Sequence, residues 1–144
     1  MIQGLSHITF IVRDLDRMEA LLVSVLGARK VYDSADTTFS LSKERFFVAG
    51  VLWLATMEGD PQPCRTYNHV AFKIEDVDHD ELLNRIRSLG LEVRQGRSRV
   101  EGEGRSIYFY DHDNNLFELH TGTLDERLYR YARGRQDEGV TQAQ

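Results

Sequence analysis

An internal repeat is the feature that most restricts the folds open to this chain. Shifting the sequence by 62 residues places the segment 68–78 over the segment 6–16, so that His69 falls on His7. Each segment opens with alternating polar and apolar residues, which is typical of a β-strand with one buried face. Each then continues into a stretch with helical spacing of apolar residues. The repeat therefore predicts two copies of one supersecondary unit.

The first copy has clear helix boundaries. Apolar residues recur at helical spacing from Leu15 to Leu26. Asp14 or Asp16 can serve as the N-cap, and Gly27 stands where a left-handed C-terminal residue is wanted. Turn residues divide the rest of this half into short β-like runs. These runs are Lys30–Tyr32, Thr38–Leu41, Arg45–Val48 and Val51–Met57. The pattern indicates a βαβββ unit.

The second copy ends in a predicted β-hairpin. Its strands are Ser106–Tyr110 and Leu116–His120, joined by a polar turn. Side chains alternate between the faces of a strand, so burial of Phe117 and Leu119 places Glu118 on the other face. Ser106 and Tyr108 share that face in the neighbouring strand. A carboxylate there is costly to leave unpaired, so we expect a cationic partner for it.

We interpret the chain as a single α+β domain made of residues 1–144. Repeat one covers about 1–58, a linker with both prolines covers 59–65, and repeat two covers about 66–123. Residues 124–144 form a C-terminal helix and tail. We expect the helix at Leu124–Ala132, with Leu124, Leu128 and Tyr131 directed inward, and a disordered polar tail at 134–144.

Charge and composition narrow the range of partners. The chain has 18 Lys and Arg against 23 Asp and Glu, a net charge of −5, and its basic residues are dispersed. Neither nucleic acid nor a membrane is an expected partner, and no segment approaches the roughly 20 apolar residues of a membrane span. Cys64 is the single cysteine and cannot form an internal disulfide. We therefore expect a cytoplasmic protein whose partner is a small molecule or a second copy of itself.

The repeat also predicts a metal site. His7 and His69 occupy the same position in the two units, and they face each other if a pseudo-twofold axis relates the two sheets. Glu118 completes a triad, and the corresponding place in the first half holds Ala55 or Thr56. Two imidazoles and one carboxylate suit a divalent transition metal. Three protein ligands leave coordination positions open, as in catalytic sites.

These features resemble the vicinal oxygen chelate superfamily, which includes glyoxalases, extradiol dioxygenases and bleomycin-binding proteins. Within it, the sequence is most similar to the fosfomycin-resistance proteins, particularly their hydrolase branch, known as FosX. The similarity extends over about residues 1–130, in five separate stretches that match in order and spacing. They are Gly4-Leu-Ser-His7, Phe39-Ser-Leu-Ser-Lys-Glu44, Arg65-Thr-Tyr-Asn-His69, Gly102-Glu-Gly-Arg-Ser-Ile-Tyr-Phe-Tyr110 and Phe117-Glu-Leu-His-Thr-Gly-Thr-Leu124.

The resemblance implies a domain-swapped homodimer with a vicinal oxygen chelate fold. It implies that His7 of one chain joins His69 and Glu118 of the other around Mn(II), although other divalent transition metals remain possible. It further implies hydrolysis of the epoxide of fosfomycin to a diol, which confers resistance to this antibiotic. In this branch, a glutamate at the place of Glu44 is the general base that activates water.

The resemblance also suggests which residues hold the phosphonate. Ser106, Tyr108 and Arg127 match family positions that bind it, and Thr9 shares the strand face of His7. A phosphonate calls for several charge-assisted donors, preferably arginines. Three arginines surround the glycine-rich loop before Ser106, and we assign Arg99 to the substrate while leaving the choice among them open. These are Arg97, Arg99 and Arg105; His112, His120 and Cys64 receive no role.

Three alternatives remain at this stage. The first is a metal-dependent transferase that adds glutathione or bacillithiol to fosfomycin, with the same metal triad and a different nucleophile. The second is a metal-free drug-binding protein, which the triad disfavours because a sequestering pocket is more naturally apolar and aromatic. The third is an Fe(II) oxygenase that uses the two histidines and the carboxylate.

Overall fold

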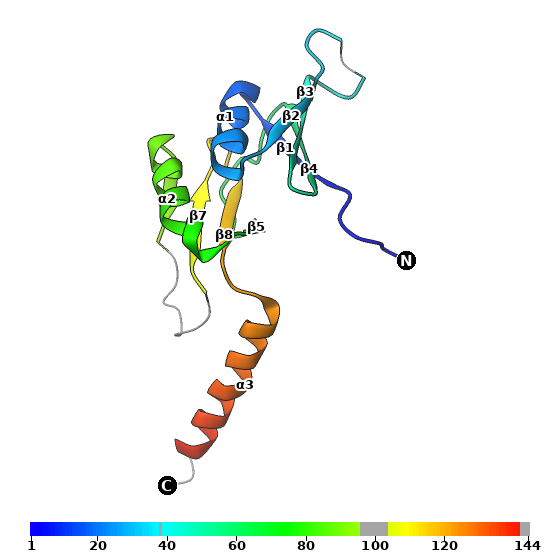
Figure 1. Cartoon of the computed structure of the whole chain (residues 1–144). Helices are drawn as coiled ribbons and strands as arrows, with labels where there is room; N and C mark the ends of the chain where they lie inside the picture. Colours follow the sequence, from blue (N-terminus) through cyan, green and yellow to red (C-terminus); the bar gives the residue numbers. More distant parts are fainter. Residues whose placement is uncertain (38, 96–103, 142–144) are drawn as a thin grey trace.

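The structure is a computed structural model that describes residues 1–37, 39–95 and 104–141. Two four-stranded sheets lie with helices α1 and α2 beside them, and helix α3 extends away from both (Figure 1). The elements are β1 (His7–Val12), α1 (Leu15–Leu26), β2 (Arg29–Asp33), β3 (Glu44–Ala49), β4 (Leu52–Glu58), β5 (His69–Lys73), the 3-10 helix η1 (Asp76–Asp78), α2 (His79–Ser88), β6 (Glu92–Arg94), β7 (Ser106–Tyr110), β8 (Leu116–His120) and α3 (Leu124–Thr141).

The two sheets have the same topology, which confirms the repeat. Their strand orders are β1-β4-β3-β2 and β5-β8-β7-β6. In each sheet the first strand runs parallel to the last strand of its unit, and the other pairings are antiparallel. Strands β1 and β5, which begin with His7 and His69, are therefore edge strands.

Helix α1 has the predicted ends. The Asp14 carboxylate accepts a hydrogen bond from the backbone N–H of Arg17, and Gly27 has a φ of 61° in the left-handed region. An N-cap of this kind satisfies one of the backbone donors that the first turn of a helix leaves free. The sequence signals therefore fix both ends of α1 and, with them, the face that it buries.

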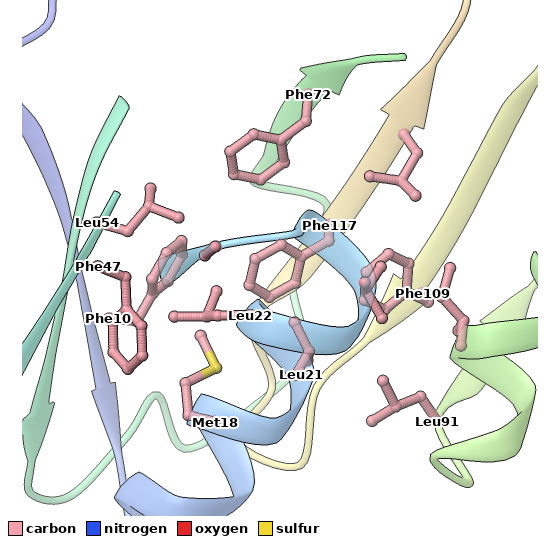
Figure 2. Packing of buried hydrophobic residues seen from close by; sticks show 14 of the residues in the cluster. Phe10, Met18, Leu21, Leu22, Phe47, Leu54, Phe72, Leu91, Phe109 and Phe117 are labelled. Carbon is pink, nitrogen blue, oxygen red and sulfur yellow. The ribbon is translucent and has the colours of Figure 1, made fainter. Parts of the chain in front are cut away.

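One apolar core joins the two halves of the chain (Figure 2). Phe117 of β8 is fully buried, and its ring lies 5.1 Å from Phe10 of β1, 5.3 Å from Phe109 and 6.2 Å from Phe72. The apolar face of α1, including Leu22, lies beside these rings. Because rings from both halves share this core, burial of each sheet's inner face depends on the other half.

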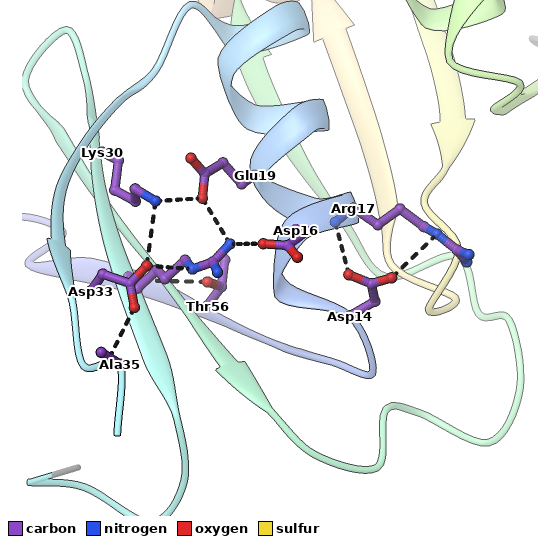
Figure 3. Close-up of polar contacts among 9 residues, drawn as sticks. Asp14, Asp16, Arg17, Glu19, Lys30, Asp33, Ala35 and Thr56 are labelled. Atoms are coloured by element: carbon purple, nitrogen blue, oxygen red, sulfur yellow. Dashed lines mark hydrogen bonds and ion pairs between the residues drawn. The ribbon is translucent and has the colours of Figure 1, made fainter. Parts of the chain in front are cut away.

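A polar cluster fixes α1 against the first sheet (Figure 3). The Arg45 guanidinium of β3 lies 2.7 Å from Asp16 and 2.8 Å from Glu19, both on α1, and 2.8 Å from Asp33 of β2. Lys30 adds a further ion pair with Glu19 at 2.9 Å. The Arg45 side chain is only 15% exposed, and such a multiply paired, poorly solvated charge is costly to displace. Arg45 thus holds β3 in one orientation.

Two expectations are wrong. Thr38–Leu41 is not a strand, because residues 39–42 form a bend, while Thr38 lies outside the described residues. Helix α3 does not stop at Ala132 but continues to Thr141, so residues 134–141 are not a disordered tail. Its predicted inward stripe is exposed, with Leu124 at 69%, Leu128 at 55% and Tyr131 at 47%.

The physical reason for the longer helix lies in its sequence. Thr123 and Glu126 form a capping box, since the Thr123 N–H donates to the Glu126 carboxylate and the Glu126 N–H to the Thr123 hydroxyl. The residues that follow are mostly good helix formers such as Arg, Gln and Glu.

Among the described residues, none of the helices combines the length and the apolar character that a membrane span requires.

We expect Phe117→Ala to lower the free energy of unfolding by about 3–5 kcal/mol, because it leaves a cavity among rings from both halves. Calorimetry should show one transition that moves as a whole, since the halves share this core. Phe39, which is 85% exposed, supplies the matched control. Phe39→Ala should change the unfolding free energy by less than about 0.5 kcal/mol. Separate transitions, only one of them shifted, would contradict the shared core.

Candidate metal centre

The structure brings two of the three predicted ligands together on the outer face of the second sheet. His69 Nε2 lies 3.1 Å from Glu118 Oε2. In the sheet register, His69 lies opposite Leu116 and Glu118 opposite Ala71, so the two side chains project from adjacent strands on one face. The Glu118 side chain is only 6% exposed and that of His69 25%. The predicted cationic or metal partner for Glu118 therefore has a defined place.

The hydrogen bonds of His69 fix which ring nitrogen faces Glu118. Its Nδ1 lies 2.8 Å from the carbonyl oxygen of Tyr67, an acceptor, so Nδ1 carries the proton. In the neutral ring, Nε2 then presents a lone pair toward a carboxylate oxygen. Two lone pairs at this separation require a positive charge between or on them, either a proton or a metal ion. This pair fits a divalent metal, and the carbonyl behind His69 is the second partner that metal-bound histidines usually have.

The surroundings of Glu118 keep it ionised. Burial by itself raises the pKa of Glu118. Hydrogen bonds from Ser106 and Tyr108 and the nearby His120 and His69 outweigh burial, so the pKa lies below its usual value of 4.5. The Tyr108 hydroxyl shows the complementary effect, because burial and its hydrogen bonds with Tyr67 and Glu118 raise its pKa. Glu118 is thus available as an anionic ligand at neutral pH.

Several residues of this face received no role from the sequence. The Tyr67 ring contacts His69 at a centroid distance of 5.0 Å and Tyr108 at 6.2 Å, and the Arg94 guanidinium lies 5.3 Å from its centre. His120 lies close to Glu118, with Nδ1 3.7 Å from Oε1. Strand alternation carries the signal for His120 because it stands two residues after Glu118. Arg94 carried no such signal, since the boundaries of its short strand were not predicted.

The third predicted ligand lies on the other sheet. His7 is exposed on β1, where its ring lies 4.3 Å from Trp53, and Thr9 projects from the same face two residues along. Within the described part of a single chain, no three metal-ligating side chains form a group. One chain therefore joins His69 to Glu118 but does not bring His7 to them.

The register explains why the first sheet has no carboxylate of its own. Ala71 of β5 lies opposite Glu118, and the equivalent residue of β1, Thr9, lies opposite Ala55. Ala55 is therefore the structural counterpart of Glu118. Each chain thus supplies one histidine–carboxylate pair and one additional histidine.

Glu44 shares a sheet face with His7 and Thr9. It lies opposite Met57, which in turn lies beside Ile11, and these positions alternate in phase with His7. Ser34 fixes the start of β3, because its hydroxyl accepts from the Glu44 N–H at 3.0 Å and its N–H donates to the Glu44 carbonyl at 3.0 Å. The neighbouring Arg45 points to the opposite face, toward α1. Glu44 is consequently held on the polar face and is 8% exposed.

The arginines of the loop before β7 separate into two groups. Arg105 is engaged with α2 and η1, because its Nε lies 2.8 Å from Asp76 Oδ1 and its Nη1 lies 2.9 Å from Asp80 Oδ1. It therefore anchors the loop and does not face Glu118. Arg97 and Arg99 lie outside the described residues. Arg127 is half-buried in the first turn of α3.

The base of this loop is fastened to the residues before α3. Gly104 has a φ of 76°, and a Cβ there would lie 2.6 Å from the backbone nitrogen of Gly122. Next to this contact, the Arg105 N–H donates to the Thr121 hydroxyl at 2.8 Å, and the Thr121 N–H donates to the Arg105 carbonyl at 3.0 Å. The start of β7 and the approach to α3 are therefore one rigid junction.

We expect Tyr108→Phe to raise the pKa of Glu118 in the metal-free protein, because the variant loses a hydroxyl donor to the carboxylate. Since the folded pKa is depressed, the stability that Glu118 contributes is present above its unfolded pKa and is lost as pH falls through the folded value. The variant should therefore lose this stability at a higher pH than the parent. Carbon-13 NMR titration of the carboxyl group checks the shift, and an unchanged pKa would show that Tyr108 does not donate.

Comparisons with known proteins agree with the fold and with the pair formed by His69 and Glu118. The profile of the Glyoxalase/Bleomycin resistance protein/Dioxygenase superfamily matches residues 4–119. The fosfomycin resistance protein FosX of Mesorhizobium japonicum is 60% identical over 134 residues, which are 93% of this chain and 96% of that protein. A more distant relative, the metallothiol transferase FosB of Shouchella clausii, is 37% identical over 136 residues, which are 91% of this chain and 88% of that protein.

A solved structure shows the same fold with ligands bound. It is the crystal structure of a variant of FosX from Listeria monocytogenes, complexed with Mn(II) and 1S,2S-dihydroxypropylphosphonic acid. Its TM-score is 0.82 at 53% sequence identity, and the match covers 91% of this chain and 99% of that chain. This chain therefore belongs to the Glyoxalase/Bleomycin resistance protein/Dioxygenase superfamily and, within it, to the FosX family of fosfomycin resistance proteins.

Proposed function

We propose that this protein is a Mn(II)-dependent hydrolase that adds water to the epoxide of fosfomycin and thereby confers resistance. The observation that carries the proposal is the 53% identical FosX structure, which holds Mn(II) together with a dihydroxypropylphosphonic acid. A dihydroxypropylphosphonic acid is what results when water opens the epoxide ring of fosfomycin. The 60% identity to FosX of Mesorhizobium japonicum over nearly the whole chain supports the same activity here.

The residues at hand fit the metal. His69 Nε2 lies 3.1 Å from a carboxylate oxygen of Glu118, and His7 supplies the third ligand in the proposal. This mixed set of nitrogen and oxygen ligands suits Mn(II), and it also suits other divalent transition metals. When bound, the metal supplies a Lewis acid that takes up the charge developing on the epoxide oxygen.

Glu44 is the general base in this proposal. Its carboxylate accepts the proton of a water molecule as that water attacks an epoxide carbon. Its place on the same face as His7 and Thr9 supports this role, as do the Ser34 hydrogen bonds that fix its backbone. In this proposal five residues bind the phosphonate and orient the epoxide between metal and base: Thr9, Arg99, Ser106, Tyr108 and Arg127.

The active site is completed by a second chain. His7 and His69 begin the edge strands of two different sheets, and both edges leave backbone groups available for a neighbouring strand. In the proposed domain-swapped homodimer, β1 of one chain approaches β5 of the other and brings His7 to the His69–Glu118 pair. The irregular segment 59–68 joins the two halves and permits this exchange.

We also propose a cytoplasmic location. The exposed Cys64 is the only cysteine, and a free thiol is most stable in a reducing compartment. Recovery of the activity in the soluble fraction of gently lysed cells would support this location, and its recovery with secreted protein would oppose it.

We expect Glu44→Gln to lower turnover by at least about a hundredfold, because glutamine keeps the shape of the side chain but cannot take a proton. Mn(II) and fosfomycin should still bind, which calorimetry measures separately from the rate. In oxygen-18 water, the parent should place one labelled oxygen in the diol on the first turnover. An unlabelled first product would indicate attack by a carboxylate and a covalent ester. Full activity in Glu44→Gln would exclude it as the base.

We expect activity to return when inactive His7→Ala and Glu118→Ala subunits are mixed. In the mixed dimer one of the two sites contains both substitutions, and the other contains neither. Refolding equal amounts together should therefore restore a substantial part of the parent activity, while each variant refolded alone stays inactive. Native mass spectrometry verifies that mixed dimers form. Mixed dimers without activity would show that the three ligands come from one chain.

A thiol transferase on the same antibiotic is the second candidate. The 37% identity to the metallothiol transferase FosB favours it, and the metal ligands would be the same. The two reactions differ in product mass, so phosphorus NMR and mass spectrometry with and without added thiol distinguish them. A diol that forms without thiol supports the hydrolase, and a product that requires thiol supports the transferase. Removal of the metal gives a further test. If the metal-free protein no longer inactivates fosfomycin, a metal-free drug-binding protein is excluded.

A further inference from the structure

We infer that Arg45 is a positioning residue for Glu44, and that it acts through Asp33 and the turn at Ser34. The inference rests on the proposed function, because it takes Glu44 as the general base. It gives the ion-pair cluster of the first sheet a part in the reaction. Arg45 itself does not face the substrate, since strand alternation directs its side chain toward α1, away from the face of Glu44.

Glu44 stands at the end of a strand, where few contacts hold the backbone. It is the first residue of β3, and an irregular loop precedes it. Met57 of β4 lies opposite on one side. On the other side the Glu44 N–H donates to the Ser34 hydroxyl, and the Ser34 N–H donates to the Glu44 carbonyl, both at 3.0 Å. The position of the Glu44 backbone therefore depends on what fixes Ser34, which is 5% exposed.

Asp33 connects Arg45 with the turn that carries Ser34. One oxygen of the Asp33 carboxylate, Oδ2, lies 2.8 Å from Arg45 Nε. The other, Oδ1, accepts from the backbone N–H of Ala35 at 3.0 Å (Figure 3). The carboxylate thus closes a turn around Ser34, and two carboxylates of α1 hold the Arg45 guanidinium in turn. A continuous series of contacts leads from α1 to the backbone of Glu44.

The turn at Ser34 is strained, so contacts from its surroundings have to hold it. Ala35 has a φ of 47°, in the left-handed region that a residue with a Cβ rarely adopts. Such a conformation persists only where neighbouring contacts determine it, and it concentrates at functional sites. The Asp33 carboxylate supplies this contact. Its ion pair with Arg45 keeps the carboxylate in the orientation that does so.

A general base needs a precisely placed carboxylate. A displacement of about 1 Å, even when its cause lies far from the reacting atoms, can lower turnover about a hundredfold. The proposed metal ligands lie on β1, β5 and β8, whereas the ion pairs of Arg45 are with α1 and β2. Loss of these ion pairs should therefore impair proton transfer to Glu44 and leave the binding of metal and substrate intact.

The test compares variants of the Mn(II)-loaded enzyme by steady-state kinetics. Arg45→Met removes the guanidinium and keeps an apolar stem, while Lys30 still pairs with Glu19 and Asp33. Asp33→Asn keeps the charge of Arg45 and weakens its hold on the turn, which separates the effect of position from that of charge. Lys30→Met is the matched control, because it removes a positive charge from the same two carboxylates and leaves Arg45 in place.

We expect Arg45→Met to lower kcat by about tenfold or more, with the KM for fosfomycin and the Mn(II) affinity unchanged. Asp33→Asn should also lower kcat. Arg45→Lys should recover part of the rate, since lysine keeps the charge with fewer contacts. Lys30→Met should stay within about twofold of the parent. In the Glu44→Gln background, Arg45→Met should cause no further loss, because Arg45 acts through Glu44.

Hydrogen exchange gives a readout that does not depend on turnover. The Glu44 N–H donates to the Ser34 hydroxyl, so its exchange reports how firmly the turn is held. We expect this amide to exchange faster in Arg45→Met than in the parent. The amides of β5, in the second sheet, should keep their exchange rates, which distinguishes local loosening from a general loss of stability.

Three results would overturn the inference. The first is parent-like turnover in Arg45→Met. The second is an equal loss from Arg45→Met with and without Glu44→Gln, since Arg45 would then act independently of the base. The third is a raised KM or weaker Mn(II) binding with kcat unchanged. Should Arg45→Met fail to fold, Asp33→Asn alone and with Glu44→Gln replaces it. Full activity in Glu44→Gln would instead refute the base in the proposed function itself.

Discussion

Burial of Phe117 between the two halves of the chain is the constraint on which the rest of this structure depends. A strand that directs Phe117 and Leu119 into the core must direct Glu118 the other way, because side chains alternate between its faces. The same core receives Phe10 from β1, and this burial keeps His7 and Thr9 on the outer face of the first sheet. The proposed metal ligands are thus placed by the apolar residues next to them, and a shift of one residue would send them into the core.

The sequence was sufficient to predict helix and strand boundaries wherever local capping residues and the periodicity of apolar residues agree. The boundaries of β7 and β8, the caps of α1 and the faces of Ser106 and Glu118 follow from strand alternation and from Asp14 and Gly27. Contacts between residues that are distant in sequence could not be predicted from it. Nothing in the sequence around Arg105 indicates that Asp76 and Asp80 engage it, because they are distant in sequence and meet only through the sheet. The outward stripe of α3 was missed because helical spacing predicts an apolar face but not what covers it.

The two halves of the chain have the same strand order but carry different candidate functional residues. The first sheet offers His7, Thr9 and Glu44, and places Ala55 where the second sheet has Glu118. The second sheet offers His69 and Glu118 with the polar side chains that orient them. Within the described residues, neither sheet by itself combines the proposed ligand pair with the proposed base. The two repeats are thus complementary halves, one with the proposed base and one with the proposed ligand pair.

The junction at Gly104 limits how such a protein can adapt. A side chain at this position would strike the backbone of Gly122, and the positive φ would strain any replacement. The hydrogen bonds between Arg105 and Thr121 stand directly beside this contact. A substitution at Gly104 would therefore displace the start of β7 and the approach to α3 together. Position 104 is closed to any single change that alters one of these two segments and leaves the other in place.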